Sequence, residues 1–553
     1  MQLKVLHIRI LIFLGGLLLF VPFLGQVHLF DWDEINFAES AREMLVSSDY
    51  LNVQIDYKIF WEKPPLFIWM QALSMKIFGI NEFAARLPNA ICGAFTLLIL
   101  FNFGRHVYGQ KFGLLWVFAY AGSILPLVYF KSGIIDPWFN LFIFLGVYYF
   151  IIYQDTLIYR SKSDRIDIAL SALFLGLAVL TKGPAALLIF GLCGLVYLII
   201  CRFRIKIRML DTFMFLAILA FVGGFWFLLQ IANGNYQMVV DFVVYQIRLF
   251  STEDAGHGGF PGYHFVILFF GVFPASIFAL KAFRRAKTDS PSQVFFKKWM
   301  IILFWTVLIL FSIVKTKIVH YSSLCYFPLT FLAAHAIYRY LNGQLKFSLW
   351  QKILIIFIAA IYAIATCLLP VIDANKLQII QGNYIKDAFA VANLQAEVSW
   401  PFSIYLIPLL LVIFLSASLL IKKTFLKISS IFISVFIFTN LMLLFIIPRV
   451  EKYTQNAAIE FYQKHKGEDC IIRTWKFKSY AHLFYAEKPI NTGSVTEFIT
   501  EEILITQETN KPVYFVCKIT SAKEFEQTYP QMKKLYEKNG FVFFEKKQEN
   551  KSL

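Results

Sequence analysis

Charged residues are scarce in this sequence, and their scarcity excludes several classes of protein. Only 16% of the 553 residues are Asp, Glu, Lys or Arg, whereas 58% are hydrophobic and 18% are aromatic. A soluble globular domain carries about 25% charged residues, so an ordinary soluble enzyme is excluded. Intrinsic disorder is excluded as well, because disordered chains combine low hydrophobicity with high net charge.

Cysteine is also scarce, with seven residues in the whole chain. Most of them lie in apolar stretches, where cysteine acts as a small apolar side chain. No spacing between them matches a zinc site. Only Cys470 and Cys517 lie in a more polar region. They could form a disulfide in an oxidising compartment, but the sequence favours two buried thiols in β-strands.

Long apolar runs, by contrast, recur from the N-terminus to residue 447. We count about thirteen, most of them close to the length of about 20 residues that crosses a bilayer. They predict an α-helical polytopic membrane protein with about thirteen transmembrane helices. The first run resembles a signal peptide, but no A-x-A-like cleavage site precedes Asp31, so we interpret it as a retained first helix.

The basic excess is explained by where the charges lie. Lys and Arg number 52 against 35 Asp and Glu, a net charge of +17. Basic residues cluster in short loops at 202–208, 281–298 and 422–427, and such loops stay on the cytoplasmic side. We therefore expect no nucleic-acid partner, a plasma (inner) membrane location and a cytoplasmic N-terminus. An odd number of helices places the C-terminal region on the outer, periplasmic side.

The sequence divides at residue 447. Residues 1–447 form the predicted transmembrane domain, and residues 448–553 form a predicted exported α/β domain. Within the second, we expect strands over 470–474 and 513–519 and a helix over 521–540. Two further stretches fall on the outer side, an expected catalytic loop over 31–86 and a second loop over 230–262.

Acidic residues gather where the chain leaves the first helix. Asp33 and Glu34 begin an expected amphipathic helix, which carries Glu39, Arg42 and Glu43 on the face opposite its apolar residues. We expect this helix to lie in the membrane interface, with the Asp-Glu pair at the depth of the lipid headgroups. The alternative is that both acids only favour the N-terminal end of a helix through its dipole.

The segment WEKPPLFIWM at 61–70 holds another charged pair at a rigid corner. Glu62 and Lys63 precede two prolines, which fix the backbone and end any preceding helix. A fixed lysine at headgroup depth suits a phosphate group. The alternative is a lysine that only extends its ammonium group to water, but such a lysine needs no rigid neighbour.

More ionisable residues lie on the same outer side. They are Lys131 and Asp136, Lys182 in the segment TKGP, Arg248 and His257, and then Lys315, Lys317 and His320, followed by Tyr321. Ionisable groups so close to membrane depth are costly, so their collection on one face indicates a site. Taken singly, Asp136 could be a helix cap and His257 could belong to a Gly-rich loop.

This set of side chains suits the transfer of a group from a phosphate-linked donor. Cationic side chains stabilise the negative charge that develops on a departing phosphate. A carboxylate takes or orients the proton of an acceptor hydroxyl. A polyprenyl-phosphate sugar would place its chain between helices and its phosphate among the headgroups. Direct displacement by the acceptor would invert the anomeric carbon.

The order of the motifs resembles the lipid A aminoarabinose transferases, which stand beside the dolichyl-phosphate-mannose protein mannosyltransferases in the GT-C class. In chain order the motifs are D-E-x(4)-E-x-x-R-E-M, E-K-P-P-L-x-x-W, A-R-L-P-N-A, Asp136-Pro137, T-K-G-P and K-x-x-x-Y. The resemblance runs through the tenth predicted helix and more loosely to the end. It implies an integral membrane glycosyltransferase that moves one sugar from a polyprenyl-phosphate donor to an envelope lipid, glycan or protein.

The resemblance also implies roles for single residues. The acids of the site would be Asp33 as the catalytic base, its partner Glu34, and Asp136. The residues that would bind the phosphate and sugar of the donor are Lys63, Arg248, Lys317, Tyr321 and Arg42. Glu62 and His257 match positions that can hold a divalent metal such as zinc, although two protein ligands are few for this ion.

The chain departs from the family pattern around this expected site. Asn36 stands where close relatives typically carry an arginine, and Val244-Tyr245 stands where an acidic residue and a histidine usually precede the loop arginine. His320 replaces a small hydroxyl residue before Tyr321. The resemblance therefore predicts the class of enzyme better than it predicts the sugar or the acceptor.

Two other functions compete with a transferase. A transporter or lipid flippase would place ionisable residues at the middle of the bilayer, often in broken helices related by repeats. Here the predicted helices are almost free of charge and the ionisable residues flank them, which favours an interfacial enzyme. A non-catalytic membrane scaffold would leave the ordered acidic and basic residues without a purpose.

Overall fold

The computed structural model describes residues 4–160, 165–203, 206, 208–251, 258–284, 288–490, 504–505 and 511–546. The helices before residue 252 are α1 (Val5–Phe20), α2 (Asp33–Ser47), α3 (Leu66–Phe78), α4 (Glu82–Tyr108), α5 (Gln110–Ala121), α6 (Ile124–Val128), η1 (Tyr129–Lys131), α7 (Asp136–Asp155), η2 (Thr156–Arg160), α8 (Arg165–Lys182), α9 (Ala185–Ile200), α10 (Met209–Ala232) and α11 (Tyr236–Ser251). Those after it are α12 (Tyr263–Gly271), α13 (Ala275–Ala279), α14 (Pro291–Ile313), η3 (Val319–Cys325), α15 (Tyr326–Leu341), α16 (Leu349–Ala374), α17 (Lys376–Gln381), α18 (Ala388–Asn393), η4 (Phe402–Tyr405), α19 (Leu406–Leu420), α20 (Thr424–Leu441), η5 (Met442–Ile446), α21 (Ile447–Glu451), α22 (Asn456–Lys464), α23 (Ala481–Tyr485) and α25 (Ile519–Thr528).

The predicted multi-pass helical architecture is confirmed. Seven helices in the described ranges are long and apolar enough to cross a membrane: Glu82–Tyr108, Asp136–Tyr159, Met209–Ala232, Pro291–Ile313, Leu349–Ala374, Phe402–Leu420 and Thr424–Glu451. The bent pair α5 and α6 with η1 would make an eighth, and three shorter apolar helices are α1, α3 and α9. A total of about thirteen transmembrane helices stays a prediction.

Large apolar side chains cover the outside of several of these helices. On α10, Phe213, Leu216 and Phe221 are 70%, 56% and 69% exposed, and α16 likewise exposes Leu349 and Ile353. Contiguous apolar surface of this kind is unfavourable in water. Hydrocarbon chains solvate it well, so these helices have faces that fit a lipid environment.

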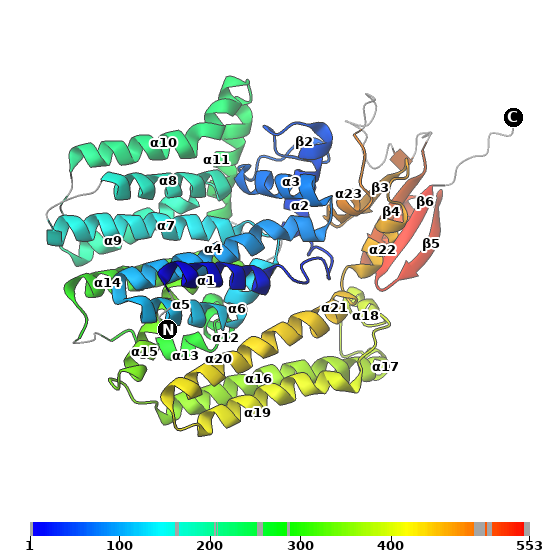
Figure 1. Cartoon of the computed structure of the whole chain (residues 1–553). Helices are drawn as coiled ribbons and strands as arrows, with labels where there is room; N and C mark the ends of the chain where they lie inside the picture. Colours follow the sequence, from blue (N-terminus) through cyan, green and yellow to red (C-terminus); the bar gives the residue numbers. More distant parts are fainter. Residues whose placement is uncertain are drawn as a thin grey trace.

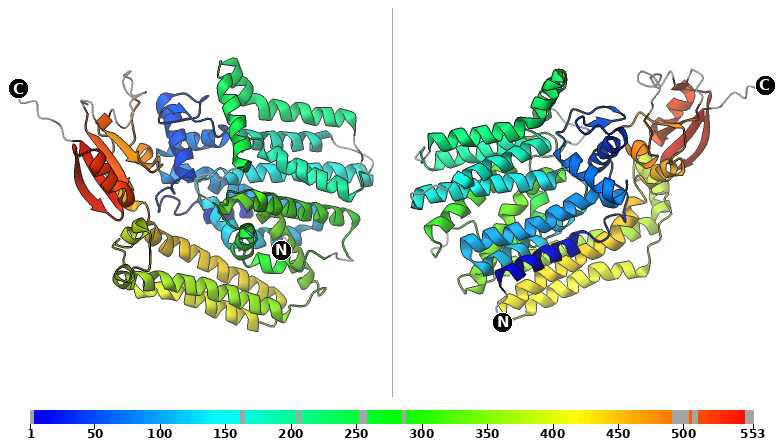
Figure 2. Two further views of the ribbon diagram at one scale, coloured as in Figure 1. Left: turned by 180° about the vertical axis from the view of Figure 1, so that it is seen from behind. Right: turned by 45° about the horizontal axis from the view of Figure 1, so that its top comes forward.

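Most of the helices lie side by side (Figure 1). The helix ends that the basic stretches join lie at one end of this group, and the segments that carry the acidic motifs lie at the other. α9 ends and α10 and α14 begin at the left-hand end of Figure 1, on either side of the basic loops. The helices α2 and α3 and the strands of the C-terminal region lie at the right-hand end. Figure 2 shows the same separation from two further directions, with α16, α19 and α20 packed as a neighbouring group.

Helix α2 is buried from Glu34 to Met44, on its charged face as well as its apolar one, which corrects the expectation of an interfacial helix with a charged outer face. Glu39 and Glu43 are fully buried and Arg42 is 1% exposed. A short antiparallel hairpin, β1 (Gln54–Ile55) with β2 (Lys58–Ile59), covers this polar face. At its turn, the backbone N–H groups of Asp56 and Tyr57 donate to the Glu43 carboxylate over 2.7 and 2.8 Å. The charged face thus contacts protein and not water.

The C-terminal region contains a four-stranded sheet in the order β3 (Ile471–Trp475), β4 (Val513–Lys518), β6 (Phe541–Lys546) and β5 (Met532–Lys538). β3 and β4 are parallel, and the other pairs are antiparallel. The two strands expected from the sequence are present. The helix expected over 521–540 is wrong beyond Thr528, because the chain turns back at Asn539 and Gly540, both with positive φ, to form the β5–β6 hairpin. An Asn-Gly turn of this type is a strong hairpin signal.

The sheet register separates the two cysteines of this region. Cys517 pairs with Trp475 in the parallel ladder, whereas Cys470 precedes Ile471 at the other end of β3. Five residues of strand span about 16 Å. A disulfide requires Cα atoms within about 7 Å of each other. The register therefore favours the interpretation of two separate strand thiols.

The C-terminal region packs against α2 and its neighbours at one end of the helical part. One apolar core contains Ile35 and Ala41 of α2 together with Ile459 of α22 and Phe484 of α23. A fourth outer stretch, α17 to α18, was not expected from the sequence, and it contacts the sheet through the rings of Phe389 and Phe541. The predicted domain boundary at residue 447 coincides with the start of α21. The helical part and the C-terminal region nevertheless share one hydrophobic core.

Candidate active site

A pocket opens between the N-terminal ends of α2 and α7, the end of α8, helix α11 and the turn η3. It encloses about 1210 Å³ of empty space, including the part that opens to solvent. Its polar lining residues are Asp33, Asn36, Glu62, Lys63, Asp136, Asn140, Lys182, Tyr245, Gln246, Thr316 and Tyr321. Its apolar lining includes Phe37, Phe60, Phe139, Ile189 and Phe311. Charged groups of both signs therefore face one cavity with apolar walls.

Asp33 is the first residue of α2, and its carboxylate is ionised in this setting. The side chain is 32% exposed, and its Oδ2 lies 3.3 Å from Nε2 of His320. Partial burial raises the pKa of Asp33, but the hydrogen bond and charge of His320, together with Lys182 and Lys63, lower it to about 2. An ionised carboxylate at the pocket wall can accept a proton or a hydrogen bond.

Asp136 begins α7, followed by Pro137, a residue favoured in the first turn of a helix because it needs no N–H partner there. Its side chain is 5% exposed. Lys182 Nζ donates to Oδ1 of Asp136 over 2.6 Å, and His320 Nε2 lies 3.6 Å from Oδ2. Four ionisable groups from four elements, α2, α7, α8 and η3, thus form one chain of close contacts.

Glu62 and Lys63 form a second charged corner of the pocket, just before Pro64 and Pro65 lead into α3. Tyr245 of α11 donates its hydroxyl to Oε2 of Glu62 over 2.9 Å. The Nζ of Lys63 lies 5.1 Å from the centre of the Tyr245 ring, and the Arg248 guanidinium lies 5.3 Å from it. Two cations therefore meet one aromatic ring, where cation–π attraction orients both.

Glu34 does not line the pocket, which corrects its expected place beside the catalytic base. Its buried carboxylate accepts hydrogen bonds from Arg86 Nη2 over 2.7 Å, from the backbone N–H of Phe30 over 2.8 Å, and from the backbone N–H of Gly133. Arg86 in turn donates to three backbone carbonyls of the segment before α2. Glu34 thus joins α4, the start of α2 and the segment before Asp136, as a structural group.

Arg42 and Lys317 were expected to bind the donor, but neither lines the pocket. Arg42 is 1% exposed and makes a bidentate ion pair with Glu39, one turn earlier on α2. Lys317 donates to the carbonyl oxygens of Phe311 and Ser312 over 2.9 and 2.8 Å. It therefore satisfies carbonyl groups at the C-terminal end of α14, which have no partner within the helix.

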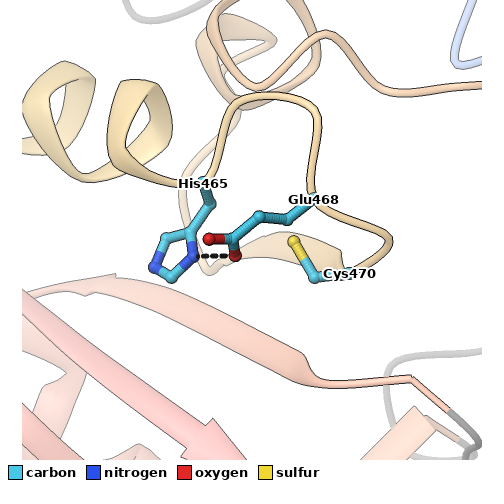
Figure 3. A group of neighbouring side chains, drawn as sticks. All are labelled: His465, Glu468 and Cys470. Carbon is cyan, nitrogen blue, oxygen red and sulfur yellow. Dashed lines mark hydrogen bonds and ion pairs between the residues drawn. The ribbon is translucent and has the colours of Figure 1, made fainter.

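The structure offers little support for a metal at the expected position. His257 lies outside the described residues, and the carboxylate of Glu62 is hydrogen bonded to Tyr245. In the part of the chain that the structure describes, one group of three side chains could hold a metal, and it lies in the C-terminal region. Figure 3 shows it: His465 Nδ1 is 2.6 Å from Glu468 Oε2, and Cys470 lies next to them. Glu468 is 53% exposed, and none of the three lines the pocket.

Two pocket residues, Lys182 and Tyr245, and the neighbouring His320 carry more weight than the sequence predicted. Lys182 and His320 were noted as outer ionisable groups without a role, and Tyr245 only as a departure from the family pattern. The glycine of the segment TKGP was a signal for Lys182. Gly183 adopts φ +108°, and a Cβ at this position would lie 2.8 Å from the Phe242 ring. Only glycine permits the turn that aims Lys182 at Asp136.

The arrangement can do chemistry that needs a base and an anion site together. Asp33 offers an ionised carboxylate, and Lys63, Lys182 and Arg248 provide positive charge within or beside the same cavity. The apolar wall can hold a lipid chain. Preorganised cations next to a leaving anion lower the barrier for its departure.

The chain matches known proteins over part of its length. The family model of dolichyl-phosphate-mannose-protein mannosyltransferases matches residues 62–226. The undecaprenyl phosphate-alpha-4-amino-4-deoxy-L-arabinose arabinosyl transferase 1 of Proteus mirabilis is 27% identical over 323 residues, which are 58% of this chain and 57% of that protein. The corresponding transferase of Pseudomonas aeruginosa is 28% identical over 336 residues, 59% of each chain. These matches span less than two thirds of the relatives' length.

The fold is shared over almost the whole chain with a solved structure. The crystal structure of ArnT from Cupriavidus metallidurans bound to undecaprenyl phosphate has a TM-score of 0.77 and covers 98% of both chains, at 16% identity. The apo structure of the same protein gives a TM-score of 0.75. The resemblance to the aminoarabinose transferases and protein mannosyltransferases, predicted from the sequence, is confirmed, and with it the helical fold with a C-terminal sheet.

Proposed function

We propose that this protein is an integral membrane glycosyltransferase that moves one sugar from a polyprenyl phosphate to an acceptor at the pocket of Asp33. The observation that carries the proposal is the pairing of an ionised carboxylate with several cations in one apolar-walled pocket. The relatives named for undecaprenyl-phosphate sugar transfer, and the solved neighbour bound to undecaprenyl phosphate, support this donor class.

The pocket residues divide the work as follows. Asp33 takes the proton of the acceptor hydroxyl, or orients it, while the acceptor oxygen attacks the anomeric carbon. Lys63 and Arg248 contact the phosphate, whose negative charge grows as the sugar leaves. Asp136 holds Lys182 beside this centre over 2.6 Å. Tyr321, whose ring centre lies 5.1 Å from the Lys182 ammonium, borders the donor sugar. Direct displacement inverts the anomeric carbon.

The setting of the reaction follows from the charge distribution. Asp33 of α2 and Glu62 and Lys63 before α3 line the pocket. In Figure 1, α2 and α3 lie at the end of the helices away from the ends of α9, α10 and α14, which the basic stretches join. We therefore place the pocket on the outer, periplasmic face of the inner membrane, with the N-terminus in the cytoplasm. Residues 448–553 then form an exported domain. The acceptor is an envelope lipid in the first instance, and a glycan or an exported protein after that.

The test measures release of free polyprenyl phosphate by the purified protein in detergent, offered a panel of undecaprenyl-phosphate sugars with envelope lipid extract. We expect release with one donor, and its loss in Asp33→Asn and Lys63→Ala. The exposed residues Glu397 and Lys386 provide matched controls, Glu397→Gln and Lys386→Ala, which should keep the wild-type rate. Folded protein without release from any donor would contradict the transferase and favour a carrier of lipids.

A further inference from the structure

His320 lies between two of the candidate acids, Asp33 and Asp136. It lies in η3 and its side chain is 16% exposed. Its Nε2 stands 3.3 Å from Oδ2 of Asp33 and 3.6 Å from Oδ2 of Asp136. The Asp136 Oδ2 atom is buried and has no closer hydrogen-bond partner among the described residues, since Lys182 takes the other oxygen. One imidazole nitrogen thus faces both candidate acids.

Hydrogen bonds fix the backbone of η3 at His320. Ser323, one turn later in η3, donates its hydroxyl to the carbonyl oxygen of His320. Asn140 of α7 donates to Ser323 over 2.7 Å and so ties this turn to the helix that carries Asp136. The Tyr321 ring packs edge-on, with ring centres 5.4 Å apart. The fixed turn and the Tyr321 ring leave Nε2 of His320 facing the carboxylates of Asp33 and Asp136.

We propose that His320 is a positioning residue for Asp33 and sets its basicity through its own charge. This inference rests on the proposed function and deepens it. The Nε2–H group donates to Oδ2 of Asp33 and leaves Oδ1 for the acceptor hydroxyl. As the acceptor oxygen bonds to the anomeric carbon, its proton moves to Asp33 Oδ1. The bond from carbon to phosphate oxygen breaks, and its electron pair stays on the phosphate.

The charge of the ring decides how good a base Asp33 is. A positive imidazolium stabilises the Asp33 carboxylate and weakens it as a base, whereas a neutral ring that still donates Nε2–H leaves it stronger. Among the described residues, Asp136 from α7 also faces His320, Lys182 from α8 pairs with Asp136 over 2.6 Å, and His264 from α12 interacts electrostatically with His320. Transfer should therefore become faster as pH rises and His320 loses its proton.

Two substitutions separate positioning from charge. His320→Gln keeps an N–H donor at a similar reach and cannot titrate, so it should retain most of the high-pH rate and lose the pH-dependent rise in kcat/KM. His320→Ala removes the donor, and we expect kcat to fall about 100-fold at every pH, since a misplaced reacting group costs about that much. The KM for the donor should change little, because Lys63 is untouched. A rise that persists in His320→Gln, or a wild-type kcat in His320→Ala, would overturn the proposal.

A second measurement is independent of activity. Histidine-labelled protein is titrated by NMR in detergent, with the His320 signal identified by its absence in His320→Gln. In Asp33→Asn and in Asp136→Asn, the midpoint of this signal should move to lower pH, because the imidazolium loses a neighbouring negative charge. Glu397→Gln should leave it unchanged. If the midpoint moves but no donor is consumed, the contact of His320 with Asp33 and Asp136 is supported and the proposed transferase is refuted. If the midpoint does not move in either variant, the contact of His320 with the two carboxylates is itself refuted.

Discussion

Two adjacent acids, Asp33 and Glu34, should respond in opposite ways to the same chemical change. Both begin α2, and replacing either by its amide removes one negative charge and almost no volume. Asp33 faces the pocket and is 32% exposed, whereas Glu34 is 2% exposed and lies against Arg86. We expect Asp33→Asn to abolish transfer in a protein of normal stability, and Glu34→Gln to destabilise the protein.

The size of the stability effect follows from the contacts of Glu34. Removing one partner of a buried ion pair costs about 3–5 kcal/mol, because the other charge stays buried. Arg86 keeps three carbonyl partners, so the lower end, about 3 kcal/mol, applies. For Asp33, which is partly exposed, the loss of its contact with His320 costs about 1 kcal/mol or less.

The assay is thermal unfolding in detergent, followed by the fluorescence of the 11 tryptophans. For Glu34→Gln the midpoint should fall by about 3 °C, and for Asp33→Asn by about 1 °C or less. Release of polyprenyl phosphate is measured on the same samples, well below both midpoints. The reasoning is refuted if Glu34→Gln unfolds at the wild-type temperature, or if Asp33→Asn loses as much stability as Glu34→Gln.

One further prediction concerns the buried face of α2, and another concerns the β1–β2 hairpin that covers it. Burial and the neighbouring Glu39 raise the pKa of Glu43 from 4.5 to about 9, so its contribution to stability is full below pH 4.5 and is lost as pH rises through 9. The thermal midpoint should therefore decrease as pH rises from 4.5 to 9, and it should decrease less in Glu43→Gln. Equal slopes in the two proteins would contradict this origin. Asp56 pairs with Arg473 and Lys488, so Asp56→Asn leaves two cations facing each other and should cost about 1–3 kcal/mol. Limited proteolysis should then cut the C-terminal region faster, and an unchanged rate would show that this ion pair does not hold it.

Much of the site was predictable because its residues lie in short, local motifs. Asp33 follows the first helix, Lys63 precedes two prolines and Asp136 precedes one, and each pattern fixes a backbone position. These three residues do line one pocket. Glu34, Arg42 and Lys317 do not line this pocket, for a common reason. A motif identifies a side chain next to the site, but not whether it turns toward the pocket or toward a buried partner.

The sequence by itself determined the class of molecule, a helical membrane protein with ionisable groups at one end and an α/β tail, because hydropathy and charge placement act along the chain. It did not determine whether α2 is buried or lies in the membrane interface. The sequence pattern of α2 is that of an interfacial helix, but in the structure the β1–β2 hairpin and the C-terminal region cover it. Nor did it join His320 to Asp33 and Asp136, which come from three elements far apart in the chain. Only tertiary packing brings such groups within hydrogen-bond reach, and burial there sets which carboxylate reacts and which one holds the fold.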